Sequence, residues 1–304
     1  MLIRHLSFFI TLARERHFAR AAAACNVTQP TLSATIRKLE EELDVHLVIR
    51  DHRFVGLTEE GEKLLTWGRQ ILADYDSLKK DLSGDKRGLT GTLRLGVIPA
   101  TMPAVSFVTS RYSATHPAVT IDIRSMSSRS IQAGLDAFEL DGGMTYLDNE
   151  PLENVQKIQL YEERYVLVVP KDHRLASSRT ATWKAALKER LCLLSEDMQN
   201  RRILNRLAES AGLEIHPHVV SNSFLALFSH LRQGEWASIM PHTFAYVVAA
   251  VPGLVAIDLV DPVHTQPIGL VLPDRDPLSP LASALLACFK EQAMVLEPVF
   301  GSRS

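Results

Sequence analysis

A short segment near the amino end, residues 18–43, constrains the fold of this chain more than any other part of it. The alanine-rich run at residues 19–24 is a strong helix former, and its small side chains let a second helix approach closely. Asn26 and Val27 then predict a turn. The hydroxyl group of Thr28 can cap a new helix, and Pro30 is tolerated in the first turn of that helix. The pattern therefore predicts two helices joined by a tight turn.

The helix that begins after Thr28 has two chemically different faces. Its apolar residues follow one another at helical spacing: Leu32, Ile36, Leu39 and Leu43. The other positions are mainly polar or basic: Thr31, Ser33, Thr35, Arg37 and Lys38. We expect the first face to pack in a core and the second to meet solvent or a partner.

Elements on both sides extend this pair of helices into a small domain. Apolar residues recur at helical spacing between Leu6 and Ala13, and residues 47–49 and 54–57 predict a hairpin, or wing, around a turn at 51–53. Thr58 can cap a long amphipathic helix over residues 59–82. A helix of that length favours a partner helix from a second chain, although it could instead pack on its own domain.

Residues 83–91 contain three glycines and have the composition of a linker. Beyond this linker, the pattern predicts strands at residues 92–98, 119–124 and 165–170. It predicts helices at residues 103–115, 130–139, 183–189, 201–211, 224–233 and 281–296. Alternating strands and helices indicate an α/β fold with mainly parallel strand pairing.

Charge and composition exclude several classes of protein. The 304 residues carry 33 Lys+Arg against 35 Asp+Glu, which argues against coating of nucleic acid or membrane by bulk positive charge. Residues 14–38 nevertheless hold five basic residues against one acidic residue, Glu15, and predict a small basic face. The amino end does not resemble a signal peptide, and the most apolar stretch, 244–257, is too short to span a membrane. We expect a cytoplasmic protein.

A helix, a turn, a second helix with a basic outer face and a wing together place one helix in the major groove of DNA. The residues of this arrangement are Phe18-Ala19-Arg20-Ala21-Ala22, Val27-Thr28-Gln29-Pro30-Thr31-Leu32-Ser33, Ile36-Arg37-Lys38-Leu39-Glu40, Leu43, Arg50 and Leu57-Thr58-Glu59-Glu60-Gly61. This series resembles the amino-terminal domain of LysR-type transcriptional regulators nearly without a gap.

Later landmarks extend the resemblance over essentially the whole chain: residues 93–97, Leu140-Asp141, Val169-Pro170 with His173, and Gln233-Gly234 before Ile239-Met240-Pro241. The resemblance implies a winged helix-turn-helix domain at 1–58, a linker or dimerisation helix and hinge at 59–91, and an effector-binding domain at 92–304. That domain would have two lobes like those of periplasmic binding proteins, lobe one at about 92–162 and 268–304 and lobe two at about 163–267.

The resemblance also implies which residues meet DNA. Gln29 would read base edges in the major groove, and Arg37 and Lys38 would contact phosphates or bases. The complete expected set is Thr28, Gln29, Pro30, Thr31, Ser33, Arg37, Lys38, Arg50 and Arg53. Thr28 could serve only as a helix cap, Ser33 could bond only within its helix, and Lys38 could simply be solvated.

The expected effector site lies between the two lobes. Free N–H groups at two helix starts, near Thr101 and Ser128, could hold an anion, so a small carboxylate is a candidate effector. The expected contacts are Ala100, Thr101, Met102, Ser127, Ser128, Glu196, Met198 and Asn222. Ser128 could instead cap its own helix.

The resemblance implies a regulator that activates or represses transcription in response to its effector, with no metal or cofactor. Expected partners are double-stranded DNA, a small molecule, RNA polymerase, and further copies of the chain in a dimer of dimers, but no membrane. An enzyme is disfavoured because nucleophile-elbow, phosphate-loop, dinucleotide and zinc-protease motifs are missing. A cytoplasmic solute-binding protein is a second alternative.

A redox-responsive regulator that uses Cys192 or Cys25 is a third alternative. The three cysteines, which include Cys288, form no Cys-x-x-Cys pair, so neither a disulfide framework nor a zinc finger is expected. A free cysteine is more often a small buried apolar residue than a sensor.

Overall fold

The computed structural model describes residues 2–51, 53–82, 88–148 and 150–300, apart from the side chains of residues 50, 51, 53, 77, 80–82 and 291–300. The chain divides into two compact units, formed mainly by residues 1–87 and by residues 88–304. The expected hairpin turn at 51–53 and linker at 83–91 lie partly outside the described residues. Each unit is considered by itself.

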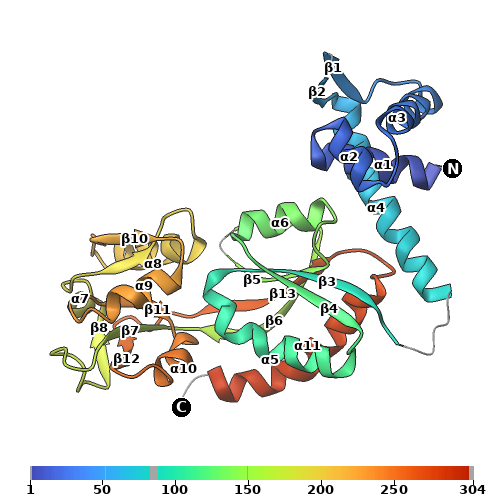
Figure 1. Ribbon diagram of the computed structural model, residues 1–304. Coiled ribbons are helices and arrows are strands. Elements are labelled where there is room, and N and C mark those ends of the chain that lie inside the picture. Colours follow the sequence, from blue (N-terminus) through green and yellow to red (C-terminus); the bar gives the residue numbers. More distant parts are fainter. Residues whose placement is uncertain (1, 52, 83–87, 149, 301–304) are drawn as a thin grey trace. The chain divides into compact units, whose positions relative to one another are not determined.

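The first unit contains helices and one hairpin (Figure 1): α1 (Leu2–Glu15), α2 (Phe18–Ala24), α3 (Gln29–Leu43), β1 (Val48–Asp51), β2 (Arg53–Leu57) and α4 (Glu59–Leu82). The predicted pair of helices joined by a turn is confirmed, as is the long helix that follows the hairpin. Buried residues of α1, α2 and α3, among them Phe9, Ala21 and Ile36, form its core. Ala21 is fully buried, because its small side chain lets the helices approach closely.

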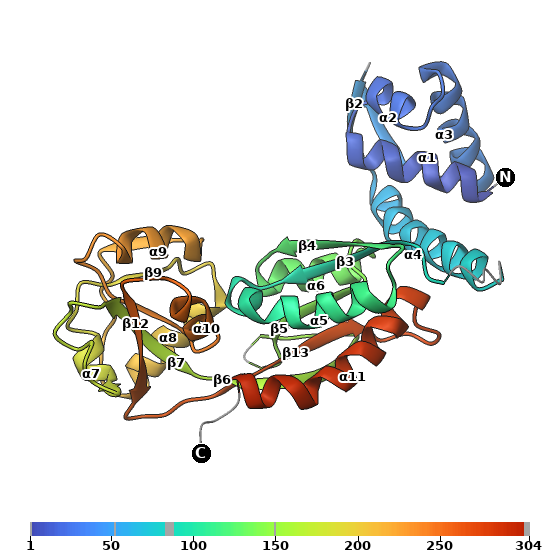
Figure 2. The same ribbon diagram turned by 60° about the horizontal axis from the view of Figure 1, so that its bottom comes forward.

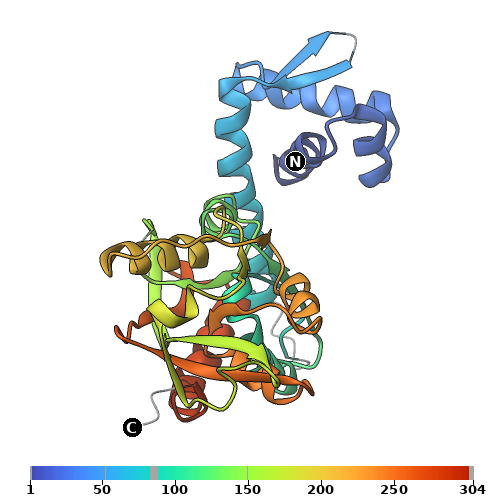
Figure 3. The same ribbon diagram turned by 90° about the vertical axis from the view of Figure 1, so that its left-hand side faces the viewer.

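The hairpin and α4 are held to the helices by side chains near the ends of these elements. The N–H groups of Leu47 and Val48 donate to Oε1 of Glu40 over 3.0 and 3.2 Å. The Thr58 hydroxyl donates to the carbonyl oxygen of His46 at 2.6 Å and accepts from the N–H of Gly61 at 2.9 Å. The hairpin projects from the helices of this unit (Figure 3).

Lobe one of the second unit is built on a five-stranded sheet in the order β4-β3-β5-β13-β6. The strands are β3 (Gly91–Val97), β4 (Val119–Ser125), β5 (Gly142–Tyr146), β6 (Val155–Glu163) and β13 (Gln266–Pro273). Its helices are η1 (Pro99–Thr101), α5 (Met102–Thr115), α6 (Ser128–Asp136) and α11 (Pro280–Phe300). Helix α6 covers one face of the sheet, and α5 and α11 cover the other (Figure 1).

Lobe two contains a four-stranded sheet in the order β11-β7-β12-β8 and a separate parallel pair, β9 and β10. The strands are β7 (Tyr165–Pro170), β8 (Thr180–Thr182), β9 (Cys192–Leu194), β10 (Val219–Ser221), β11 (Ser238–Pro241) and β12 (Leu254–Val260). Its helices are α7 (Trp183–Ala186), α8 (Gln199–Ser210), α9 (Phe224–Leu231) and α10 (Phe244–Ala249).

Strand β7 is buried along its whole length and supports a core on each side of its sheet. Leu167 and Val169 belong to the large core that continues into lobe one. Val168, on the opposite face, packs in a second cluster with Phe224 and Phe244. This alternation follows from the two-residue period of a strand, and it holds α9 and α10 against the sheet.

The chain passes between the lobes twice (Figure 2): β6 leads through Arg164 into β7, and residues 261–265 connect β12 to β13. The predicted two-lobed α/β class is confirmed, but the expected mainly parallel pairing is wrong. Strand β13 is antiparallel to β5 and β6, and β7 is antiparallel to β11 and β12. The direction of β13 is set by its entry from the other lobe and not by a crossover helix.

No helix within the described ranges combines the length and the apolar composition that a membrane-spanning helix needs.

Candidate functional site

The outer face of α3 gathers most of the residues that the sequence associates with DNA. Leu32, Ile36 and Leu39 are completely buried, and they fix the rotation of the helix about its axis. The opposite side chains are exposed, except for the half-buried Ser33; the set is Thr28, Gln29, Pro30, Thr31, Ser33, Arg37 and Lys38. A continuous polar and basic surface results.

Hydroxyl groups fix the start of α3. Oγ1 of Thr28 accepts a hydrogen bond from the N–H of Thr31 at 3.4 Å and lies 2.8 Å from Oγ1 of Thr31. Thr28 therefore acts as the N-cap, as its sequence position suggests. Contacts of these two threonines with DNA stay a prediction.

The cations of the first unit fall into two groups. Arg14 pairs with Glu15 at 3.0 Å, and Arg20 donates to the carbonyl oxygen of Glu15 at 2.6 Å. By contrast, neither Arg37 nor Lys38 forms an ion pair within the described part of the chain. These two side chains are therefore available for phosphate. The side chains of Arg50 and Arg53 lie outside the described residues.

A hollow of about 570 Å³ lies beside the start of α3. Its wall is formed by Arg16, His17, Phe18, Ala19, Gln29, Phe54 and Val55. The rings of Phe18 and Phe54 meet edge to face at 6.5 Å, so the hollow joins α2 to the hairpin. Of these residues, Gln29 belongs to the predicted DNA-contacting set and Arg16 to the predicted basic face. His17 and Phe54 carry no distinctive local signal, because each fits ordinary capping or packing.

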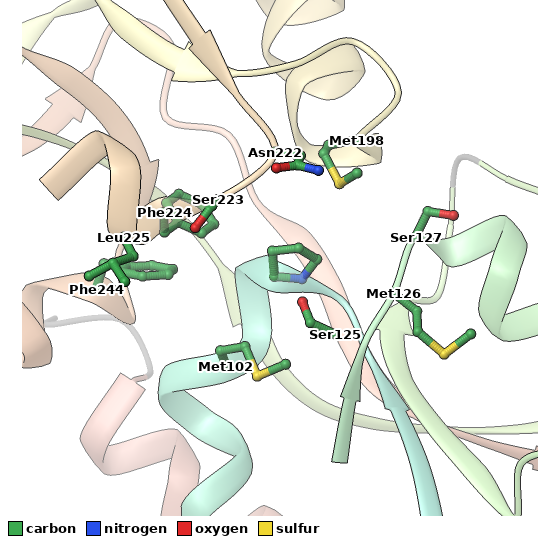
Figure 4. A pocket seen from close by; sticks show the side chains of 11 residues that line it. Met102, Ser125, Met126, Ser127, Met198, Asn222, Ser223, Phe224, Leu225 and Phe244 are labelled. Atoms are coloured by element: carbon green, nitrogen blue, oxygen red, sulfur yellow. The ribbon is translucent and has the colours of Figure 1, made fainter. Parts of the chain in front are cut away.

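A second cavity, of about 500 Å³, lies between the lobes of the second unit. Figure 4 shows Met126 and Ser127 on one side of it and Phe224, Leu225 and Phe244 on the other. The lining residues are Pro99, Met102, Ser125, Met126, Ser127, Met198, Asn222, Ser223, Phe224, Leu225 and Phe244. None of the lining residues that the structure describes is charged.

Four of the expected effector contacts line this cavity: Met102, Ser127, Met198 and Asn222. The other four do not. Ala100 and Thr101 are buried, Glu196 is exposed, and Ser128 is buried against lobe two. Phe224, Leu225 and Phe244 were not expected, because apolar residues at helical spacing look like ordinary core in a sequence.

Buried polar side chains join the lobes beside the cavity. Ser128 donates to Oε1 of Gln199, and Thr145 donates to Ser128 at 3.2 Å. Nε2 of Gln199 also donates to the carbonyl oxygen of Asp148 at 3.1 Å, and Nδ2 of Asn200 donates to the hydroxyl of Tyr146 at 2.9 Å. The start of α8 is thus anchored to lobe one by two successive amides.

Glu163 ends β6 at the first crossing between the lobes and is completely buried. The hydroxyl of Tyr146 donates to its Oε1 at 2.6 Å. Burial raises the pKa of Glu163 to about 8, against the lowering effect of the hydroxyl groups of Tyr146 and Tyr165. The carboxyl group is therefore mainly protonated at neutral pH, which avoids a buried charge at the crossing.

Two of the three cysteines, Cys192 and Cys288, are buried. Cys25, Cys192 and Cys288 are all free. Cys192 is completely buried, and this burial raises its pKa to about 11, so that little thiolate is present at neutral pH. Among the described residues, no group of three or more His, Cys, Asp or Glu side chains could hold a metal ion.

Two family models match the chain. Residues 3–62 match the model described as "Bacterial regulatory helix-turn-helix protein, lysR family". Residues 86–294 match the model described as "LysR substrate binding domain". The first range contains α3 and the hairpin, and the second contains the cavity between the lobes.

Similar proteins cover nearly the whole chain. The DNA-binding transcriptional dual regulator OxyR of Escherichia coli (strain K12) is 29% identical over 279 residues, which are 91% of this chain and 91% of that protein. Full-length OxyR from Pseudomonas aeruginosa has the same fold, with a TM-score of 0.76, 23% identity and 95% coverage of both chains. Full-length CbnR in complex with its target DNA also has this fold, with a TM-score of 0.59 and 21% sequence identity. The match covers 96% of this chain and 100% of the CbnR chain.

Proposed function

We propose a function from the premise that this chain belongs to the LysR family of bacterial transcriptional regulators. It binds particular promoter sequences through α3, and a small molecule in the cavity between its lobes changes activation or repression. The observation that carries this proposal is the outer face of α3, where exposed Gln29, Arg37 and Lys38 lie opposite a fully buried apolar face. A helix with this division of residues fits the major groove.

We propose distinct tasks for the residues on this face. The amide of Gln29, exposed at the start of α3, can pair with the edge of an adenine. Arg37 and Lys38 supply charge to phosphates, and Arg50 and Arg53 would reach the DNA backbone from the hairpin. Thr28, Pro30, Thr31 and Ser33 complete the surface, with Thr28 also holding the helix start.

The division of labour along the chain is also a proposal. Residues 1–58 would bind DNA, residues 59–91 would pair two chains and act as a hinge, and residues 92–304 would bind the effector. Trp67, Ile71, Tyr75 and Leu78 form an exposed apolar stripe on α4 that supports pairing between chains. A dimer of dimers, contact with RNA polymerase and a cytoplasmic location complete this account, which involves no catalytic reaction and no cofactor.

The thiol alternative has less support. The relatives include proteins named "Hydrogen peroxide-inducible genes activator", at 29% identity. In this chain, however, Cys192 is buried with a raised pKa, and Cys25 lies at the carboxyl end of α2. A peroxide sensor needs an accessible thiolate. We therefore favour a bound small molecule as the signal.

The proposal is tested by selection of DNA. The full chain is incubated with sheared genomic DNA of the bacterium that encodes it, and the retained fragments are sequenced. We expect a limited set of sites whose two halves are related by two-fold symmetry, and Gln29→Ala should alter the preferred base at one position in each half. Retention of fragments in proportion to their abundance would reject sequence-specific binding.

A further inference from the structure

The wall of the cavity between the lobes indicates the chemical class of the effector. We propose that this effector is an uncharged molecule with an apolar or aromatic body and one hydrogen-bonding end, and not a small carboxylate. The inference rests on the proposed function, because it concerns the ligand of that same cavity.

Most of the wall is apolar and adaptable. Met102, Met126 and Met198 contribute thioether side chains from three different segments of the chain. The rings of Phe224 and Phe244 pack at the lobe-two side with centroids 4.1 Å apart and planes tilted by 37°. Thioethers form favourable contacts with aromatic rings and adjust to irregular shapes, so this wall suits a flat or apolar ligand body.

The polar groups of the wall are neutral. They are the hydroxyls of Ser125, Ser127 and Ser223 and the amide of Asn222. Each can donate and accept a hydrogen bond, but none can neutralise a charge. Moving a carboxylate from water into such a cavity costs free energy that these groups return only in part, whereas a neutral amide or hydroxyl loses far less.

At both helix starts that could hold an anion, some backbone N–H groups already donate hydrogen bonds within the chain. At the start of α5, Pro99 and Pro103 have no N–H group, the N–H of Thr101 donates to Ile98 at 3.0 Å, and that of Met102 donates to Pro99. At α6, the N–H of Ser130 donates to the hydroxyl of Ser127 at 3.2 Å. These bonds leave fewer N–H groups at the two helix starts for a carboxylate than the sequence suggests.

The arginines of α8, which follow Met198, also have other partners. Arg201 donates to the carbonyl oxygen of Leu194 at 3.2 Å and to Oδ1 of Asn205 at 2.8 Å. Arg202 donates to backbone oxygens and forms an ion pair with Glu150. A carboxylate in the cavity would have to compete for either guanidinium.

The test compares matched neutral and charged probes on the full chain labelled with ¹³C at its methionine methyl groups. The pairs are benzamide with benzoate, phenylacetamide with phenylacetate, and indole-3-acetamide with indole-3-acetate. We expect the amides to shift the signals of Met102, Met126 and Met198, and each carboxylate to bind at least tenfold more weakly. The buried Met144, which belongs to a different core cluster from Phe224 and Phe244, serves as the internal control. Carboxylates that bind as tightly as the amides, or shifts from no probe, would overturn the proposal.

A charge introduced into the wall provides a second test. Met198→Arg should reverse the preference by tenfold or more in favour of the carboxylates, whereas Met198→Leu should keep the preference of the parent chain. An unchanged preference in Met198→Arg would contradict selection by charge. DNA binding is measured in parallel. If the chain prefers the amides but binds DNA without sequence specificity, the proposed function is rejected and the ligand class is kept. If the chain binds DNA with sequence specificity but does not prefer the amides, the ligand class is rejected and the proposed function is kept.

Discussion

Glu163 is a completely buried acid at the crossing between the lobes, and its pKa of about 8 links folding to pH. In the unfolded chain this carboxyl group loses its proton near its ordinary pKa of 4.5. Between that pH and about 8, the folded chain keeps a proton that the unfolded chain has lost. The free energy of unfolding therefore falls as the pH rises through this window, by up to about 1.4 kcal/mol per pH unit from this group.

Glu163→Gln should remove that dependence, because a neutral amide can take the place of the protonated acid. We expect the variant to gain stability relative to the parent chain as the pH rises from 5.5 to 7.5, with each kcal/mol worth about 2–4 °C in the unfolding temperature. Thermal unfolding across this range measures the difference. Glu162→Gln, at the exposed neighbouring position, is the control. If the difference in unfolding temperature between Glu163→Gln and the parent chain does not change with pH, the carboxyl group of Glu163 is ionised in the folded chain.

Individual residues of the candidate sites were predicted unevenly. The sequence pattern around Thr28 shows its capping role, because capping depends on neighbours three residues away. The wall residues Phe224 and Phe244 belong to different helices that meet over one sheet, and no local pattern links them. Thr101 was expected at the cavity because it lies at a helix start with free N–H groups, but its own N–H and hydroxyl both donate to the carbonyl oxygen of Ile98, at 3.0 and 3.1 Å.

At the scale of elements, the junction between the hairpin and α4 depends on a close approach at Gly61. A Cβ atom at this position would overlap the carbonyl oxygen of Leu47. We expect Gly61→Ala to destabilise the first unit by about 1–3 kcal/mol, because backbone atoms must shift. Gly68→Ala, in the same helix, is the control: its Cβ would meet Leu6 at 3.4 Å, and a gain of helix stability is expected. The free energy of unfolding is measured with denaturant. Equal changes in Gly61→Ala and Gly68→Ala would contradict the close approach at Gly61.

Helix α4 also presents the exposed stripe that we assign to pairing of chains. Trp67 is 63% exposed and Leu78 is 53% exposed, which is unusual for large apolar residues on a stable surface. Trp67→Glu should shift the chain toward monomer in sedimentation experiments and weaken its binding to two-fold DNA sites. Thr66→Glu places the same charge beside the stripe and should leave assembly intact. A parent chain that is already monomeric would reject this role of the stripe.

The elements that the sequence predicted best are those whose signals are local. Helices α3 and α4 carry caps and a sustained helical period, and β7 is a nearly continuous apolar run. The apolar stretch at 244–257 gave no such signal, and the structure divides it into α10 and β12 around Pro252-Gly253. The antiparallel direction of β13 depends on a strand from the other lobe, so no local pattern could supply it.

The whole molecule combines DNA binding and effector binding in one chain. A ligand between the lobes can change DNA binding only if it binds two states of the chain with different affinity. The buried bonds from Gln199 and Asn200 to lobe one offer a set of interactions that such states could exchange. The near balance of charge in the whole chain is consistent with this division, because only a small basic face is needed to find particular sites.

The most direct test is the affinity of the full chain for a selected DNA site and for the same bases in scrambled order, measured by fluorescence anisotropy across a series of salt concentrations. We expect the selected site to bind about a thousandfold more tightly or better at physiological salt. Arg37→Ala should lower the log–log salt slope by about one unit, whereas Lys63→Ala, whose ammonium pairs with Glu59 on α4 at 2.7 Å, should not. Equal affinity for the two DNAs would contradict the account.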